Sequence, residues 1–257
     1  MKTRLDVEMT RRNLTESRRR AQELVASGKV SVNAVVRTKS SYLVDETDEI
    51  EITGEQLKFV GRGGLKLEHA INTFKINVTD KLCLDIGAST GGFTDCLLQS
   101  GAKKVCAVDV GHGQLHPSLL NREDVLSLEG INIRDLQVED IGFLPEFICC
   151  DVSFISLTAV IEKLPSLMPE NCECALLIKP QFEVGRQNIG KNGIVKDKKA
   201  HIAAISKILD CCRDNGIRVI DVCKSCITGT DGNVEYLLYA KREEATQNMI
   251  DIKAVVG

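Results

Sequence analysis

The spacing of apolar and polar positions divides the chain into two parts. From about residue 80 onward, short apolar runs alternate with helix-length segments, a pattern typical of βαβ units around a mostly parallel sheet. The runs that predict strands are Lys81–Asp85, Lys104–Asp109, Val125–Leu128, Phe147–Asp151, Cys174–Lys179, Ile217–Cys223 and Glu235–Lys241. Seven strands with intervening helices predict a doubly wound, Rossmann-like α/β domain, with Val184–Lys199 as a long mobile loop beside its substrate site.

The first 58 residues follow a different pattern. Two short helices are predicted, one over residues 4–12 and one that opens with Thr15 as its N-cap and closes before Gly28. The apolar residues of the second helix share one face, so we expect its arginines to face outward. A strand over 29–33, a turn at Asn33-Ala34 and an alternating segment over 41–52 complete a small α+β unit.

Glycine-rich residues 59–64 are expected to link this unit to the α/β domain. We therefore predict a first domain over 1–58, a linker over 59–64 and a second domain over 65–245, beginning with a helix from Leu65 to Phe74.

Charge is distributed unevenly between the two parts. Residues 1–40 hold ten Lys or Arg and four acids, an excess of six positive charges, so the rest of the 257-residue chain carries a net charge of −9. A positive lobe on an otherwise acidic protein indicates a bound polyanion. The candidate contacts are Arg4, Arg11, Arg12, Arg18, Arg19, Arg20, Lys29, Asn33 and Lys39.

Composition argues against several classes of protein. No run approaches the roughly 20 apolar residues of a membrane span, and the N-terminus lacks the apolar core of a secretory signal, so we expect a cytoplasmic protein that does not bind membranes. The eleven cysteines lie mainly in apolar, strand-like runs, where cysteine acts as a small hydrophobe in a reducing compartment. Cys223 and Cys226 form a lone C-x-x-C pair, so no metal site is predicted.

The clearest chemical motif is the glycine-rich turn in LDIGASTGGFTD, residues 84–95, where a strand ends and a helix begins. Small residues there let the backbone pass close beneath a nucleoside. A dinucleotide site would need G-x-G-x-x-G, but Ser89 stands at its second glycine, and no G-K-[ST] follows as in a P-loop. The D-x-G-x-x-x-G form suits S-adenosylmethionine, which has no phosphate. The candidate cofactor contacts are Asp85, Gly87, Ala88, Ser89, Thr90, Gly91, Gly92, Phe93, Asp109, Val110 and Asp151.

The same turn also satisfies G-x-S-x-G, the nucleophile elbow of α/β-hydrolases. That elbow normally follows several strands and precedes a late histidine that completes a triad. Here it follows the first strand of its domain, and the last histidine, His201, precedes the final strands. A cofactor turn is the better interpretation.

Charged residues end several of the predicted strands. Asp85, Asp109, Asp151 and Lys179 each follow an apolar run, and parallel α/β sheets bind ligands beyond the carboxyl ends of their strands. We expect these side chains to form one site, in which Asp109, 24 residues after Asp85, holds ribose hydroxyls.

Two resemblances add to this interpretation. The segment RLD…ESRRRAQELVASGKVSVN resembles the alpha-L RNA-binding module of a ribosomal small-subunit protein, although Ala34 stands where that module has glycine. GRGGLKLEHA, LDIGASTGGFTDCLL, DVSFISL, LIKPQFEVGR and GNVEYLL resemble the TlyA family of ribosomal RNA 2'-O-methyltransferases, with an FtsJ-like catalytic domain. The resemblance extends over essentially the whole chain.

This second resemblance implies a catalytic tetrad of Lys66, Asp151, Lys179 and Glu235. It also implies S-adenosylmethionine as cofactor, a cytidine ribose in ribosomal RNA as substrate, and an assembled ribosomal subunit as a further candidate partner. Two alternatives stay open. TlyA-like proteins are also described as hemolysins, which damage membranes, and a non-catalytic RNA-binding assembly factor would share the fold.

Overall fold

The computed structural model describes residues 2–12, 14–15, 17–52, 58–229, 231–243 and 248–257. The chain divides into two compact units, residues 1–56 and 57–257. Each unit has its own buried apolar cluster.

The first unit packs two helices against short antiparallel strands. Its helices are α1 (Leu5–Arg11) and α2 (Arg18–Ala26). Its strands are β1 (Thr3–Arg4), β2 (Val30–Val32), β3 (Val35–Val36), β4 (Leu43–Val44) and β5 (Ile50–Ile52). β1 pairs with β4, and β2 lies between β3 and β5. The predicted α+β character is confirmed.

Local signals in this unit were partly misassigned. The N-cap of α2 is Ser17, whose side chain accepts a hydrogen bond from the backbone N–H of Arg20, so the prediction of Thr15 was wrong. Asn33 and Ala34 both have positive φ, 51° and 63°, in the two-residue turn between β2 and β3. Such hairpin turns need positive φ at both central residues, so Ala34 occupies a position that favours glycine.

The second unit is built around a seven-stranded sheet in the order β11-β12-β10-β9-β6-β7-β8. The sheet is parallel except for β12, which pairs antiparallel with both β10 and β11. The strands are β6 (Leu82–Ile86), β7 (Lys104–Asp109), β8 (Val125–Glu129), β9 (Phe147–Cys150), β10 (Glu173–Ile178), β11 (Ile217–Lys224) and β12 (Tyr236–Arg242). All seven predicted strands, and the predicted α/β fold, are confirmed.

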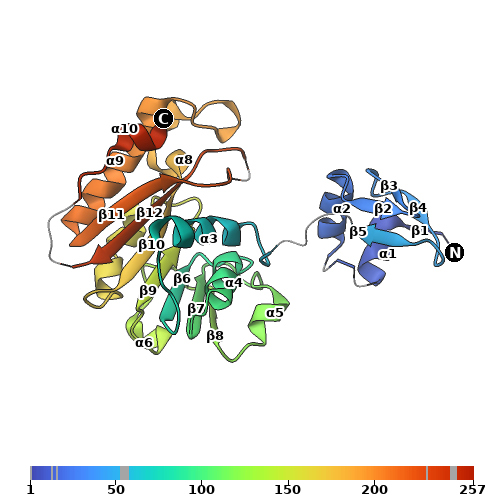
Figure 1. The fold of residues 1–257 in the computed structure, drawn as a ribbon, viewed down its shortest axis with the longest axis horizontal. Coiled ribbons are helices and arrows are strands. Elements are labelled where there is room, and N and C mark those ends of the chain that lie inside the picture. The colour runs from blue at the N-terminus through green and yellow to red at the C-terminus, as the bar shows by residue number, and fades with distance from the viewer. Residues whose placement is uncertain (1, 13, 16, 53–57, 230, 244–247) are drawn as a thin grey trace. The chain divides into compact units, whose positions relative to one another are not determined.

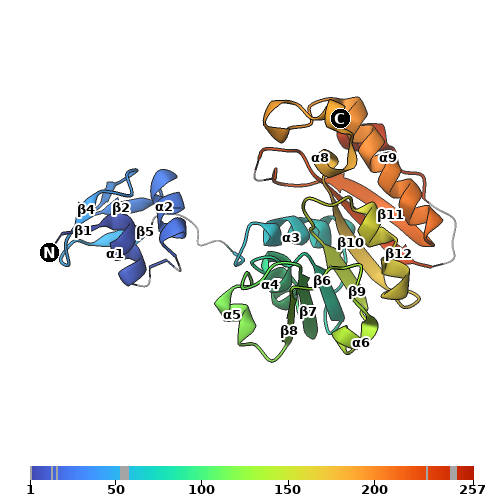
Figure 2. The same ribbon diagram turned by 180° about the vertical axis from the view of Figure 1, so that it is seen from behind.

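Helices cover both faces of this sheet (Figures 1 and 2). α3 and α4 supply Leu67 and Leu97 to the core of one face, and α6 and α9 supply Ile141 and Ile205 to the other. The helices are α3 (Gly63–Phe74), α4 (Gly92–Gln99), α5 (Pro117–Leu120), α6 (Val138–Ile141), α7 (Thr158–Ile161), α8 (Pro180–Glu183), α9 (Lys198–Asp214) and α10 (Ile252–Val256), with single 3₁₀ turns η1 (Leu164–Ser166), η2 (Arg186–Asn188) and η3 (Lys191–Gly193). α3 begins two residues earlier than predicted.

The segment predicted as a long loop after Val184 holds η2, η3 and the start of α9. Asn233 accepts a hydrogen bond from the backbone N–H of Val195 at 3.0 Å and donates one to the Gly193 carbonyl at 3.0 Å. The ring of His201 contacts the Val195 carbonyl at 2.9 Å. These buried contacts fasten the segment beside β12.

Candidate active site

Four charged side chains from distant parts of the sequence meet at the carboxyl edge of the sheet. Lys66 lies on α3, Asp151 follows β9, Lys179 follows β10, and Glu235 precedes β12. Lys179 Nζ lies 2.6 Å from Asp151 Oδ1, and Lys66 Nζ lies 3.6 Å from Asp151 Oδ2 and 2.6 Å from Glu235 Oε2. The structure thus brings together all four residues of the predicted tetrad.

The ion pairs connect the four side chains in the order Lys179, Asp151, Lys66 and Glu235, so positive and negative charges alternate. Three of them are buried: Lys66 is 7% exposed, Lys179 is 8% exposed and Glu235 is 2% exposed. Burial of a charge is costly unless an opposite charge lies close by. Each lysine here contacts a carboxylate, and Lys179 also donates a hydrogen bond to Ser153 Oγ at 2.8 Å. The arrangement therefore holds Lys179 Nζ in one position.

The four residues line a cavity of about 660 Å³, which the glycine turn closes on one side. A second cavity, of about 480 Å³, is lined by Asp109, Val110, Ile133 and neighbouring residues. Five residues line both cavities, namely Gly87, Ser89, Asp151, Ser153 and Phe154. The two cavities therefore adjoin, and Asp151 is the member of the charged set that lines both.

Gly87 is required by the geometry of this junction. Its φ is +81°, and a Cβ atom there would lie 2.6 Å from the carbonyl oxygen of Asp151. Every other residue type would therefore strain the backbone and push the β9 end away. Gly91 also has positive φ, 91°, but lines neither cavity. Ala88, Ser89, Thr90, Gly92 and Phe93 line the first cavity.

Asp109 joins the two loops that border the second cavity. Its carboxylate accepts hydrogen bonds from the backbone N–H groups of Ser89 at 2.8 Å and Gly111 at 2.7 Å. From the sequence, this carboxylate is expected to hold ribose hydroxyls. A carboxylate has about four acceptor sites, and two remain for a ligand in the cavity that Asp109 lines.

Asp85 is a second predicted cofactor contact, after Gly91, that lies outside both cavities. Side chains alternate along β6, so Leu84 and Ile86 enter the core beneath α6 and α9, while Asp85 points toward α4. There it is fully buried and accepts a hydrogen bond from Thr94 Oγ1 at 2.6 Å. Burial raises the pKa of Asp85 to about 7, although the bonds from Thr94 and Cys149 act in the opposite direction. Asp85 lines neither cavity.

Two aromatic residues outside the predicted site line the mouth of the first cavity. Phe154 is 93% exposed with a positive φ of 66°, and its ring centroid lies 5.4 Å from that of Phe182. Phe154 stands three residues after Asp151, within the DVSFISL motif. An aromatic side chain just beyond a strand end was the signal that could have identified it.

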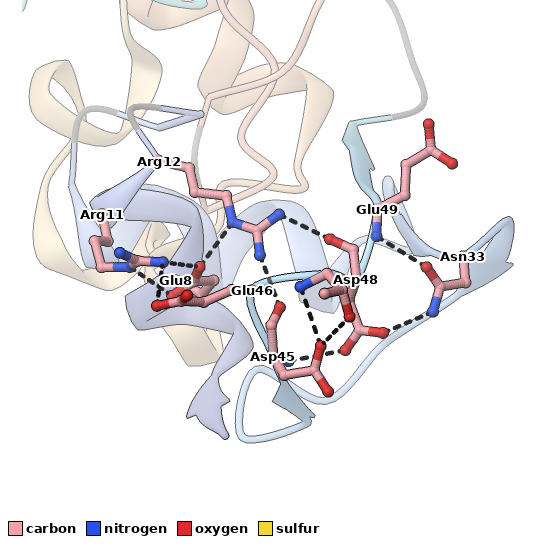
Figure 3. Close-up of polar contacts among 9 residues, drawn as sticks. Glu8, Arg11, Arg12, Asn33, Asp45, Glu46, Asp48 and Glu49 are labelled. Carbon is pink, nitrogen blue, oxygen red and sulfur yellow. Dashed lines mark hydrogen bonds and ion pairs between the residues drawn. The ribbon is translucent and has the colours of Figure 1, made fainter. Parts of the chain in front are cut away.

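In the first unit, several candidate RNA contacts are engaged in internal ion pairs. Arg11 and Arg12 both contact the buried Glu8 at 2.7 Å, and Arg12 also donates to the carbonyls of Asp45 and Asp48 (Figure 3). Hydrogen bonds from these arginines lower the pKa of Glu8 to about 2. Arg12, one of the candidate RNA contacts, therefore braces the loop over 45–48.

A second buried carboxylate, Asp6, engages two further arginines of the set. It accepts hydrogen bonds from Arg4, Arg18 and Gln22. Burial raises the pKa of Asp6, but these bonds outweigh burial and hold it well below its usual value. Asn33 donates to Asp48 Oδ1 at 2.7 Å and accepts from the N–H of Glu49 (Figure 3). Arg19, Lys29 and Lys39 remain exposed.

Two family descriptions match the chain over these units. The FtsJ-like methyltransferase family matches residues 59–242, and the S4 domain family matches residues 3–50. The chain belongs to the FtsJ-like methyltransferase family. The match includes both cavities and all four charged residues, so the site described above lies within the methyltransferase domain.

Similar proteins cover almost the same length. Hemolysin A of Brachyspira hyodysenteriae is 45% identical, covering 92% of this chain and 98% of its own. The 16S/23S rRNA (cytidine-2'-O)-methyltransferase TlyA of Mycobacterium tuberculosis is 38% identical, covering 94% and 91%. A solved structure from Streptococcus thermophilus, named as a candidate hemolysin, is 40% identical, with a TM-score of 0.80 and coverage of 99% and 94%.

Two of these names refer to hemolysins. Among the residues that the structure describes, no helix has the length and apolar character needed to span a bilayer. The same residues include no cluster of three or more His, Cys, Asp or Glu arranged to hold a metal ion.

Proposed function

We propose that this protein transfers a methyl group from S-adenosylmethionine to the 2'-hydroxyl of a ribose, in a cytidine of ribosomal RNA. One observation carries the proposal: the buried series of Lys179, Asp151, Lys66 and Glu235 opens onto a cavity that adjoins a second one of suitable size for a nucleoside. Ligand sites commonly have volumes of about 300–1,000 Å³.

The residues of the second cavity fit S-adenosylmethionine. Val110 and Ile133 supply apolar walls for a base, and Asp109 supplies acceptors for the two hydroxyls of a ribose. Gly87, which lacks a Cβ, allows the ligand to pass close to the backbone where the cavities join. When bound, the cofactor supplies an electrophilic methyl group on a sulfonium sulfur.

Lys179 and Asp151 would act on the hydroxyl of the substrate. A hydroxyl is a weak nucleophile until its proton is accepted or its lone pair is aligned. Lys179 Nζ, held by Asp151 and Ser153, would contact the 2'-hydroxyl and align its oxygen with the methyl group, and the hydroxyl proton would pass to water as the new bond forms. Lys66 and Glu235 would hold Asp151 in place. Alignment of the reacting atoms would account for much of the rate.

The aromatic pair supports a nucleotide substrate. Bases taken out of a stack are commonly held against aromatic side chains, and the exposed ring of Phe154 lies at the mouth of the cavity that holds Lys179. The S4 domain supplies further basic residues for RNA. The name of the TlyA relative supports ribosomal RNA as the target and cytidine as the modified nucleotide. We propose that the substrate is an assembled ribosomal subunit in the cytoplasm.

The test is methyl transfer from labelled S-adenosylmethionine to separate small and large ribosomal subunits, with the modified ribose mapped by its resistance to cleavage. We expect one dominant cytidine, and we expect Lys179→Ala to abolish transfer while cofactor binding stays near normal. Near-normal turnover by Lys179→Ala would refute the assigned role. Binding of subunits without methyl transfer would instead support an assembly factor, and leakage of lipid vesicles that survives Lys179→Ala would support a hemolysin.

A further inference from the structure

The aromatic pair at the mouth of the active site comes from two separate segments. Phe154 lies between the end of β9 and the start of α7, and Phe182 lies on α8. A bulky residue with positive φ is uncommon, and it persists only where the surrounding structure holds it. The position of Phe154, which is 93% exposed, must therefore be fixed by neighbouring residues in its segment.

Glu183, the last residue of α8, connects the segment of Phe154 to the helix that carries Phe182. Its Oε1 accepts a hydrogen bond from the backbone N–H of Leu157 at 2.7 Å, and its Oε2 accepts one from Ser156 Oγ at 2.6 Å. The side chain of Glu183 is only 1% exposed. Because Ser156 and Leu157 follow Phe154 closely, these two bonds fasten the Phe154 segment to the helix that carries Phe182.

Lys207 completes the connection from α9. Its Nζ lies 3.0 Å from Glu183 Oε2 and donates to Ser156 Oγ at 3.2 Å. It also contacts the backbone carbonyl of Glu183 at 3.4 Å. A buried carboxylate with three donors is held more firmly than a surface ion pair, because little water competes for it.

We propose that Glu183, supported by Lys207, is a positioning residue that fixes Phe154 and Phe182 as the platform for the target base. The inference rests on the proposed function, in which that base stacks at the mouth of the cavity. Glu183 lines neither cavity and so touches neither substrate nor cofactor. Its loss is expected to weaken the productive binding of RNA more than the chemical step.

A spectroscopic test can observe this loop directly. The chain has no tryptophan, so Phe154→Trp introduces a single fluorescent reporter at the platform. The comparison is between Phe154→Trp alone and the double variant that carries both Phe154→Trp and Glu183→Ala. In the double variant we expect the amplitude of the fast local component of the time-resolved anisotropy decay to be about twofold larger, because nanosecond loop motion is no longer restrained. Glu183→Gln keeps one acceptor oxygen and should give an intermediate value.

Kinetics on ribosomal subunits form the second arm, with Phe154 unchanged. Glu183→Ala should raise the KM for RNA about tenfold with a smaller change in kcat, since misplacement of a positioning group by a fraction of an ångström is costly. Lys207→Met should give a smaller change in the same direction. Arg213→Met is the matched control, because Arg213 also lies on α9 and pairs with Asp210 at 2.8 Å, but on the surface.

The outcomes separate the two proposals. An unchanged anisotropy decay, or an unchanged KM in both Glu183→Ala and Lys207→Met, would overturn the role of Glu183. An equal effect of Arg213→Met would overturn it too. If the wild-type protein methylates no ribosomal RNA, the proposed function fails, yet the anisotropy decay still decides whether Glu183 holds the Phe154 segment.

Discussion

The buried Asp85 should make the stability of the second unit depend on pH. Its carboxylate lies under the glycine turn with Thr94 Oγ1 as its close hydrogen-bond donor, and burial raises its pKa to about 7. In the unfolded chain an aspartate has a pKa of about 3.9. The folded state therefore holds this proton more tightly, so stability falls as pH rises from about 4 to about 7 and then levels off.

The size of the effect follows from the separation of the two pKa values. Each unit corresponds to about 1.4 kcal/mol, so between pH 5 and pH 8 ionisation of Asp85 should cost about 3 kcal/mol, nearly all of it below pH 7. Asp85→Asn keeps an oxygen that accepts from Thr94 and removes the titration. Between pH 5 and pH 8, the free energy of unfolding of the wild type should therefore fall by about 3 kcal/mol relative to that of Asp85→Asn.

Urea denaturation followed by far-ultraviolet circular dichroism, at several pH values between 5 and 8, measures this difference. Groups that titrate elsewhere affect both proteins equally, so only the difference between the two profiles matters. Parallel profiles would refute the reasoning, because they would mean that Asp85 ionises in the folded protein as readily as in the unfolded chain. Because Asp85 lines neither cavity, Asp85→Asn should also retain cofactor binding.

The remaining predictions concern four single positions. Ala34→Gly should stabilise the first unit by about 1 kcal/mol in thermal or urea denaturation, because alanine at positive φ is strained; a loss of stability would contradict the assigned turn. Arg12→Met should destabilise the same unit by about 3 kcal/mol, because it leaves the buried Glu8 with one arginine fewer. Arg19 is exposed, so Arg19→Met should weaken RNA binding with no change in melting temperature. Gly87→Ala should abolish S-adenosylmethionine binding in calorimetry, because its Cβ would lie 2.6 Å from the Asp151 carbonyl; a normal affinity would exclude that junction as the cofactor site.

The strands of the second unit could be located from the sequence because each is a short apolar run bounded by polar residues. Lys104–Asp109 was predicted at its observed bounds, β6 is shifted by one residue at both ends, and β9 ends one residue earlier than predicted. The order of strands and the antiparallel direction of β12 were not predicted, since pairing depends on contacts between residues far apart in the chain. The single-turn helices α5 to α7 have too few residues to show a periodic pattern.

Charge in the first unit shows where sequence reasoning is limited. The excess of basic residues over 1–40 is a property of the composition. Which arginines are available to RNA depends on two acids, Asp6 and Glu8, that the fold buries beside them. Because a buried carboxylate must be paired, the tertiary structure uses Arg12 as an internal brace and leaves Arg19 exposed.

By itself, the sequence determined the strands of the second unit, the glycine turn and the charged residue types at the strand ends, because periodicity and turn chemistry act locally. Only the tertiary structure decided which of those charges meet. Lys66 and Glu235 are separated by most of the second unit in sequence, yet lie 2.6 Å apart at Nζ and Oε2, while alternation along β6 turns Asp85 away from the same site. A side chain's direction is set by the sheet and helices packed around it, and that packing is a property of the whole chain.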